Sequence, residues 1–122
     1  FAPSVAEEVW SEYFDLDAAA EYPARFMLVA CPVKEEKRSV IPATTHVNGS
    51  ARVQVVRKQD NPIYHRLIRK FGDLTGVPVV LNTSFNLKGE PIVASPIDAV
   101  ATLMRCGLDA LYYEGFRAER PQ

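Results

Sequence analysis

The hydrophobic pattern is most regular over residues 62–75, where it predicts an amphipathic helix. One stripe of apolar residues recurs at spacings of three and four: Ile63, Leu67, Ile68, Phe71 and Leu74. Asp60 or Asn61 can cap this helix, Pro62 suits its first turn, and Gly76 can end it.

Two further helices are predicted, one at each end of the chain. Ser4 and Glu7 fit a capping box before an apolar face over 5–14. Near the other end of the chain, Ser95 can cap another helix with a buried apolar face, and Gly107 can end it.

Four short runs predict strands: 26–33, 51–57, 77–81 and 110–113. The run 77–81 is continuously apolar, as in a central strand covered on both faces. Residues 15–25 are expected to form a loop, and the mixed charges of 34–38 indicate an exposed turn or loop. Strands and helices alternate from 51 to 113, so we expect one α/β sheet with helices packed on it.

Composition narrows the class of protein. The 122 residues are 48% hydrophobic and 24% charged, which is typical of a single globular domain. A net charge of −1 argues against nucleic-acid binding, and no apolar run is long enough to span a membrane. Cys31 and Cys106 match neither a disulfide framework nor a zinc site, so we expect reduced thiols and a cytoplasmic location. Because the chain starts at Phe1 without an initiator Met, we interpret it as a piece of a longer protein.

A polar cluster follows the predicted central strand directly. It consists of Asn82, Thr83, Ser84 and Asn86, on a loop leaving a strand end, where α/β proteins bind ligands. Uncharged amides and hydroxyls suit phosphate oxygens, a carboxamide or a base edge. The alternative is a turn whose side chains bond only to their own backbone.

Charged and imidazole side chains add secondary candidates. Arg52 follows an Asn48-Gly49 turn and can make a forked contact with phosphate, although a surface salt bridge would also explain it. His46 and Lys88 lie near turns, where each is either a ligand or an ordinary exposed residue. His65 falls inside the 62–75 helix and is expected to be solvated.

Standard catalytic motifs are missing from the sequence. It contains no phosphate-binding G-x-x-x-x-G-K-[ST], no G-x-G-x-x-G, no G-x-S-x-G, and no Cys/His cluster with metal-ligand spacing. These patterns alone therefore predict neither a catalytic residue nor a metal site.

Two stretches, "THVNGSARVQ" and "LNTSFNLKGEPI", resemble the C-terminal domain of the O-carbamoyltransferases, the nodulation-protein-U type and antibiotic-tailoring enzymes. The likeness extends through "FAPSV" and "SPIDAVATLMRCGLDALYYEGF" and so covers nearly all of residues 1–122. The resemblance implies a YrdC-like domain, a twisted mixed α/β sheet with packed helices, of which this chain is a part.

The same resemblance implies a function and a site. Domains of this family form carbamoyl-adenylate from ATP, with Mg²⁺, and carbamoyl phosphate. A separate N-terminal, actin-like domain then transfers the carbamoyl group to a hydroxyl of the acceptor. The family's nucleotide-binding elements match Arg52, Ser84 and Asn86. Other arginine- and lysine-containing elements of the family lie upstream of "FAPSV", so we expect the isolated chain to bind ATP weakly and to be inactive.

Two other interpretations stay open. The chain can be a non-catalytic α/β binding or dimerisation module, and a homodimer is compatible with either view. An RNA-binding domain is disfavoured by the near-neutral charge.

Overall fold

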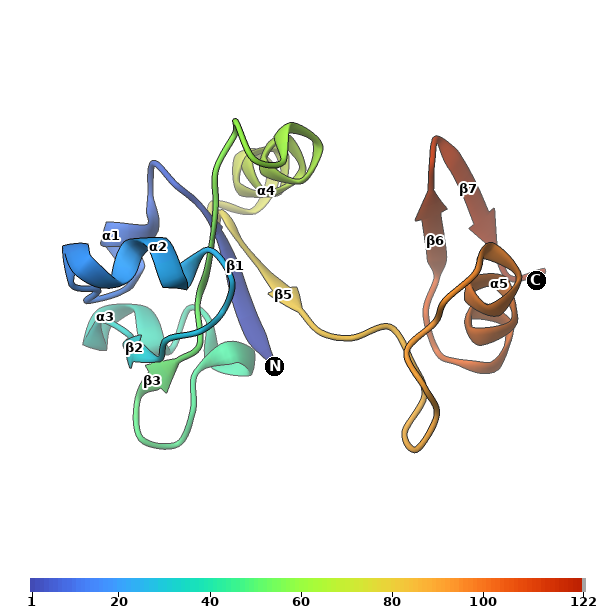
Figure 1. The fold of residues 1–122 in the computed structure, drawn as a ribbon, viewed down its shortest axis with the longest axis horizontal. Coiled ribbons are helices and arrows are strands. Elements are labelled where there is room, and N and C mark those ends of the chain that lie inside the picture. The colour runs from blue at the N-terminus through green and yellow to red at the C-terminus, as the bar shows by residue number, and fades with distance from the viewer. Residues whose placement is uncertain (122) are drawn as a thin grey trace. The chain divides into compact units, whose positions relative to one another are not determined.

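A computed structural model describes residues 1–121 and confirms a mixed α/β fold (Figure 1). The chain forms two compact units, Phe1–Thr83 and the part from Ser84 onward, and each is described by itself. Among the described residues, no helix has both the length and the apolar content needed to cross a bilayer.

The first unit is built on a three-stranded mixed sheet of β1 (Ala2–Ala6), β4 (Gln54–Val56) and β5 (Val79–Asn82). Its central strand β1 runs parallel to β4 and antiparallel to β5. All five residues of β1 are buried. The middle of the sheet is therefore the first segment of the chain.

The predicted helix 5–14 with its capping box is wrong. Ser4 lies within β1, and the helix in this region is the short α1 (Trp10–Tyr13). The Glu7 carboxylate accepts a hydrogen bond from the Lys58 N–H instead of covering a helix start. The strand conformation depends on pairing with residues about 50 and 75 positions further along, which no local pattern reveals.

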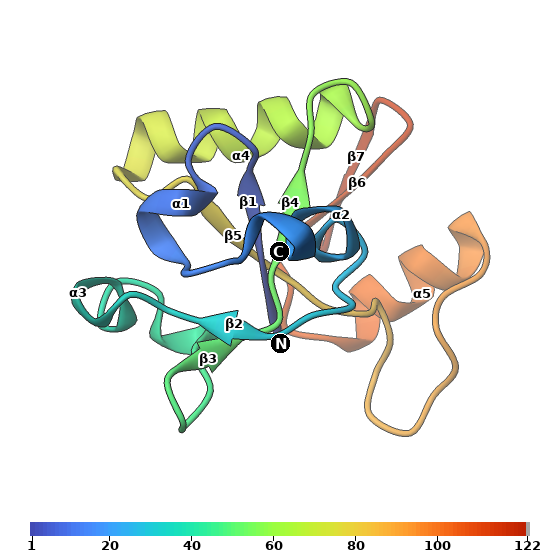
Figure 2. The same cartoon turned by 60° about the vertical axis from the view of Figure 1, so that its left-hand side comes forward.

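Alternating residues of the sheet supply two hydrophobic clusters. Val5, Val53 and Val55 face the larger one, which includes Phe14. The opposite side of the sheet packs against α4 (Pro62–Thr75) in a smaller cluster: Ala6, Val56 and Ile68, with Val80 packed against them. Figure 2 shows the axis of α4 running across the direction of β1 and β4.

The helix α4 confirms the clearest sequence prediction. Asn61 caps it by accepting a hydrogen bond from the Tyr64 N–H at 3.1 Å, and Gly76 ends it with φ 77°. Of the predicted apolar stripe, Ile68 is fully buried. The other members are exposed in the described chain: Ile63, Leu67, Phe71 and Leu74.

The strand 77–81, predicted to be central, is an edge strand instead. β5 pairs with β1 on one side, and Leu81 is exposed. Its apolar character has a different cause: Val79 faces the larger cluster and Val80 the smaller one.

Short elements fill the rest of the first unit: η1 (Ala18–Ala20), α2 (Glu21–Ala24), β2 (Cys31–Pro32), α3 (Glu35–Arg38), η2 (Pro42–Thr44) and β3 (Ser50–Ala51). The expected loop 15–25 thus contains helical turns, and the charged run 34–38 is a short exposed helix. The predicted strand 26–33 shrinks to the two residues of β2, since Met27 takes a positive φ of 57° that interrupts an extended run. The strand 51–57 is interrupted between β3 and β4.

The second unit contains α5 (Pro96–Arg105), β6 (Ala110–Tyr113) and β7 (Phe116–Glu119). Both predicted elements are confirmed, with Ser95 capping α5 through the Asp98 N–H. However, β6 pairs with β7 in a two-stranded sheet of its own, so the single sheet expected across 51–113 is wrong. Glu114 and Gly115 both take positive φ in the connecting turn, as tight hairpins require.

Candidate functional site

A polar row crosses the α4-facing side of the sheet and consists of Ser4, Gln54 and Asn82. Gln54 Oε1 accepts hydrogen bonds from Ser4 Oγ and from Asn82 Nδ2, each at 2.7 Å. Asn82 Nδ2 also lies 3.6 Å from Met27 Sδ. Ser4 is fully buried, so its bond to Gln54 satisfies a hydroxyl that would otherwise be orphaned. The predicted ligand Asn82 is thus part of a network that joins all three strands.

Arg52 lies between β3 and β4, just before the polar row. It is exposed, whereas its neighbours Ala51 and Val53 are fully buried. This alternation places the Arg52 side chain on the same side of the backbone as Gln54. Within residues 1–121, the Arg52 guanidinium makes no hydrogen bond or ion pair, so all its donors are free for a ligand.

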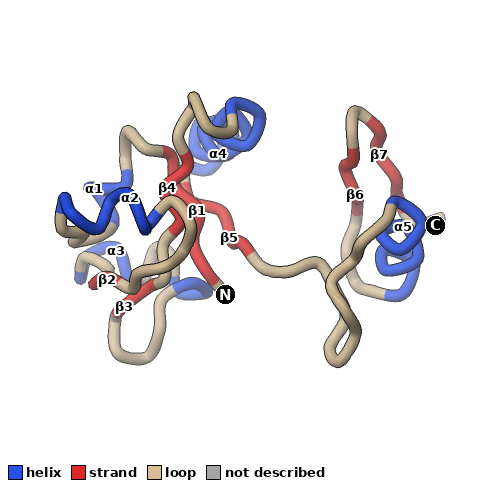
Figure 3. The backbone as a smooth tube through the Cα atoms, viewed as in Figure 1, coloured by secondary structure: helices blue, strands red, loops and turns tan. Residues whose placement is uncertain are grey.

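The loop after β5 carries the other predicted ligands. Figure 3 shows that no helix or strand interrupts the path from β5 to α5. Thr83, the last residue of the first unit, and Ser84, the first of the second, are both exposed. Neither hydroxyl is engaged in a hydrogen bond with the described residues, and both can therefore donate to a ligand.

Asn86 holds this loop in shape. Its Nδ2 donates to the carbonyls of Leu87 at 3.0 Å and Glu90 at 3.2 Å. The side chain therefore offers a ligand its Oδ1, an acceptor, rather than its amide donors. Lys88 is exposed at the tip of the turn, beside Gly89 with φ 84°.

His46 belongs to a tight turn. Its Nδ1 lies 3.1 Å from Ser50 Oγ, which donates to Asn48 Oδ1 at 2.7 Å. Gly49 takes a φ of 77° in this turn, where an added Cβ would also collide with the Arg38 guanidinium. The imidazole thus has a structural partner, although its ring is exposed.

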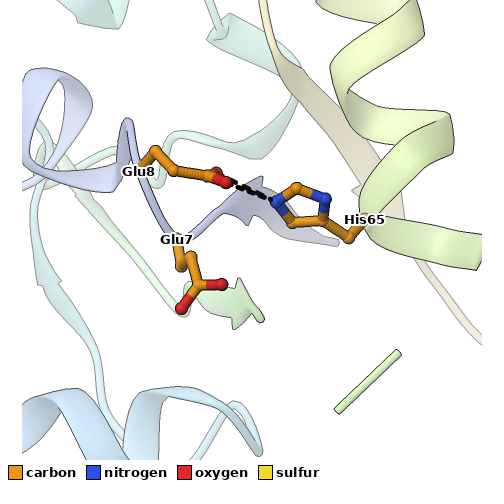
Figure 4. A group of neighbouring side chains, drawn as sticks. All are labelled: Glu7, Glu8 and His65. Carbon is orange, nitrogen blue, oxygen red and sulfur yellow. Dashed lines mark hydrogen bonds and ion pairs between the residues drawn. The ribbon is translucent and has the colours of Figure 1, made fainter. Parts of the chain in front are cut away.

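A cluster that the sequence did not reveal joins the end of β1 to α4: Glu7, Glu8 and His65 (Figure 4). His65 was expected to be solvated but is 6% exposed, since its Nε2 lies 2.9 Å from both carboxylate oxygens of Glu8. Burial raises the pKa of the Glu8 carboxyl, but the hydrogen bond and charge of His65, with the charge of Arg69, outweigh it and lower the pKa.

The same three side chains are the candidate metal ligands among the described residues, with atoms within 4.8 Å of one another. Glu7 is already engaged, by the Lys58 N–H at 2.9 Å and by Arg57 Nε at 3.5 Å. The position of His65 Nε2 between two Glu8 oxygens suits a donated proton, which removes the electron pair that a metal needs. The geometry therefore favours a hydrogen bond between His65 and Glu8 over a metal site.

Comparison with known proteins assigns the chain to a family. Residues 1–120 match the family model described as "Carbamoyltransferase C-terminus". The chain belongs to this family. The carbamoyltransferase C-terminal family thus accounts for nearly every described residue.

Relatives of the chain occur in several organisms. The nodulation protein NolNO of Sinorhizobium fredii is 49% identical over 112 residues, which are 91% of this chain and 16% of the relative. A 3'-hydroxymethylcephem-O-carbamoyltransferase of Amycolatopsis lactamdurans is 45% identical over 75 residues, 62% of this chain and 14% of the relative. An uncharacterized protein of Methanocaldococcus jannaschii is 40% identical over 120 residues, 98% of this chain and 19% of the relative. The matched residues make up between 14% and 19% of the length of these three relatives.

The three residues that the sequence predicts as nucleotide ligands are divided between the two units. Arg52 belongs to the first unit, and Ser84 and Asn86 belong to the second. Sequence reasoning missed Ser4 and Gln54, which hold the polar row together. Gln54 could have been found, because it follows Arg52 by two positions in an alternating segment. Ser4 could not, because its local sequence is that of a helix cap.

Proposed function

We propose that this chain is part of an ATP-dependent O-carbamoyltransferase and contributes to forming carbamoyl-adenylate from carbamoyl phosphate and ATP. A separate acceptor-binding domain of the same parent protein would transfer the carbamoyl group to a hydroxyl. The observation that carries this proposal is the free, exposed guanidinium of Arg52 beside a row of uncharged side chains, in a chain of this family.

The proposed chemistry requires binding and orientation rather than a protein nucleophile. Water first cleaves the bond between phosphorus and the bridging oxygen of carbamoyl phosphate, which gives carbamate and inorganic phosphate. A carbamate oxygen then attacks the α-phosphorus of ATP, and pyrophosphate leaves. Charge builds on phosphate oxygens during this in-line displacement, so fixed positive charge lowers the barrier. Arg52 supplies such a charge, and its forked guanidinium suits two phosphate oxygens at once.

Ser84 and Asn86 take different parts in this proposal. The free Ser84 hydroxyl donates to a phosphate oxygen. Asn86 keeps the loop in shape through Leu87 and Glu90, and its Oδ1 is left to accept an amino N–H, either of the base or of the carbamoyl group. His46, Thr83 and Lys88 are secondary contacts.

Mg²⁺ fits this arrangement as a partner of the nucleotide. Arg52 and the polar row contain no carboxylate, so these residues would contact the phosphates while Mg²⁺ neutralises other phosphate oxygens. We therefore expect the chain by itself to have little affinity for Mg²⁺ without nucleotide.

The test is titration of the 122-residue chain with Mg-ATP, followed by amide NMR shifts. We expect weak, saturable shifts centred on 44–52 and 82–89, and no carbamoyl-phosphate-dependent ATP cleavage. Arg52→Ala should weaken binding by roughly tenfold, the effect of losing one charged hydrogen-bonding group. Arg66→Ala, on the exposed surface of α4, is the matched control and should change binding less than twofold.

A binding or dimerisation module is the alternative. It predicts no saturable shift at millimolar ATP, or shifts away from both segments. In the full-length parent, normal carbamoyl transfer by both Arg52→Ala and Ser84→Ala would refute the proposed site.

A further inference from the structure

A cleft of about 350 Å³ runs along the outer edge of β4. It lies within the first unit, where the chain around α2 and the start of α4 flank the strand (Figure 2). Its polar lining includes Arg25, Gln54, Arg57 and Asp60, and its aromatic lining includes Tyr22 and Phe26. Arg57 follows β4 whereas Arg52 precedes it and does not line the cleft, although Gln54 at the start of β4 belongs both to the polar row and to the lining of this cleft.

Both arginines of the cleft lack hydrogen bonds. Each side chain is only about 20% exposed, yet within residues 1–121 neither guanidinium has a hydrogen-bond acceptor. Arg25 Nε is fully buried and has no partner. Because buried donors are normally satisfied, an orphaned guanidinium N–H indicates a missing acceptor.

The carboxylates around the cleft are too distant to fill this role. Arg25 lies 3.8 Å from Glu21 and 3.9 Å from Asp60. Arg57 lies 3.5 Å from Glu7 and 3.8 Å from Asp60. All four separations exceed the 2.7–3.2 Å of an N–H···O hydrogen bond. Asp60 is shared between the two arginines and is half exposed, so it can be displaced by a better acceptor.

We propose that this cleft binds the phosphate group of a small molecule, with Arg25 and Arg57 as its ligands and Asp60 as the internal competitor that the phosphate replaces. A tetrahedral dianion carries enough oxygens to accept from both guanidinium forks at once. Gln54 Nε2, which makes no hydrogen bond within the described residues, supplies a further donor in the lining. Tyr22 and Phe26 are more than half exposed and pack edge-to-face with their ring centroids 5.6 Å apart, and the Arg25 guanidinium lies over the Tyr22 ring at 5.2 Å, so the exposed parts of the two rings are left to contact an apolar group attached to the phosphate.

Titration of the 122-residue chain with inorganic phosphate, at constant ionic strength, tests the site. The readout is the side-chain Nε–H NMR signal of Arg25, which should shift saturably and become protected from exchange with water. Arg25→Gln and Arg57→Gln should each weaken binding by roughly tenfold or more. Arg66→Gln is the control for loss of a surface charge and should leave affinity within twofold.

Asp60→Asn gives the sharpest result, because it should strengthen phosphate binding severalfold by removing the competing carboxylate. Two further probes define the ligand. Phenyl phosphate binding more tightly than inorganic phosphate would assign the cleft to an aromatic phosphate ester, and equal affinities would assign it to free phosphate.

Three outcomes would overturn the site. They are no saturable shift with phosphate, acetate binding as tightly as phosphate, or equal weakening by Arg66→Gln and Arg25→Gln. The Arg52→Ala variant should still bind phosphate in this cleft, because Arg52 does not line it. A failed test of the proposed nucleotide site would therefore not contradict the phosphate site.

Discussion

The two units of this chain are assembled from contacts of very different range. In the first, β1 pairs with strands about 50 and 75 residues away, and Glu8 reaches His65 across 57 positions. In the second, β6 pairs with β7 across a two-residue turn, and Ser95 bonds to Asp98 three positions on. The polar row is a product of the long-range pairing, whereas the Ser84–Asn86 loop is shaped by its immediate neighbours.

This difference in contact range separates two kinds of predicted ligand side chain: those fixed by a short local motif and those that depend on the whole sheet. A side chain such as Asn86 is fixed by carbonyls one and four residues away, so a short motif carries its geometry intact. The environment of Arg52 instead depends on Gln54 meeting Ser4, which requires the whole sheet. Disturbing the core of the first unit should therefore alter Arg52 more than Asn86.

Phe14→Ala should have the largest effect on stability. Phe14 is 1% exposed in the main core, and such a truncation costs about 3–5 kcal/mol of the free energy of unfolding. Trp10, the single tryptophan, lies against the same core, so urea unfolding followed by its fluorescence reports on this unit.

Phe116→Ala in the second unit is the matched control. This ring is 77% exposed, and its loss should cost about 0.5 kcal/mol or less. Because Trp10 lies in the first unit, the cost in the second unit is measured by amide hydrogen exchange in β6 and β7. Equal costs for the two substitutions would contradict the view that the main core gives the first unit its stability.

Elements fixed by local contacts could be predicted from the sequence, whereas elements fixed by long-range contacts could not. The helix α4 and the second unit's α5 and β6 were located correctly, because caps, apolar spacing and turn residues act over a few positions. The strand β1 was mistaken for a helix start, because Ser4 and Glu7 have the spacing of a capping box and their real partners are distant.

The site shows the same limit. Motif resemblance selected Arg52, Ser84 and Asn86, and the sequence left open whether the polar side chains of the loop bond to a ligand or to their own backbone. The amide donors of Asn86 follow the second alternative, because they bond to carbonyls of their own loop. The sequence could not show that His65 would be buried against Glu8. That pair exists because the end of β1 lies beside α4, a consequence of sheet assembly rather than of local pattern.

Gln54→Met tests the long-range contacts of the first unit and should lower the free energy of unfolding by less than Phe14→Ala does. The substitution preserves length but leaves the buried Ser4 hydroxyl without its acceptor, which should cost about 1–3 kcal/mol. Urea unfolding followed by Trp10 fluorescence measures the change.

Ser95→Ala removes a local hydrogen bond for comparison. Loss of this helix cap should cost about 1 kcal/mol and appear as faster amide exchange at the start of α5.

An unchanged urea midpoint for Gln54→Met would mean that the polar row contributes nothing to the stability of the sheet.

The smallest effect is expected from the Glu8–His65 pair, and it should depend on pH. The pKa of Glu8 is lowered in the folded chain, so the folded state holds this proton less tightly than the unfolded state does. The resulting stabilisation is complete above the ordinary glutamate pKa of about 4.3 and is lost as pH falls through the lower folded value. Since the Glu8 side chain is half exposed, we expect less than about 1 kcal/mol.

Glu8→Gln should therefore destabilise the chain near pH 6 and make little difference near pH 3, when unfolding is measured by Trp10 fluorescence at both values. Asp73→Asn is the local counterpart in the same unit, since Asp73 pairs with Lys70 three residues away on the exposed surface of α4. It should have no measurable effect on the same signal at either pH. A Glu8→Gln penalty that stayed constant down to pH 3 would show that the side chain stabilises by packing and not by its charge. The Glu8 carboxylate charge would then have no energetic role in joining β1 to α4.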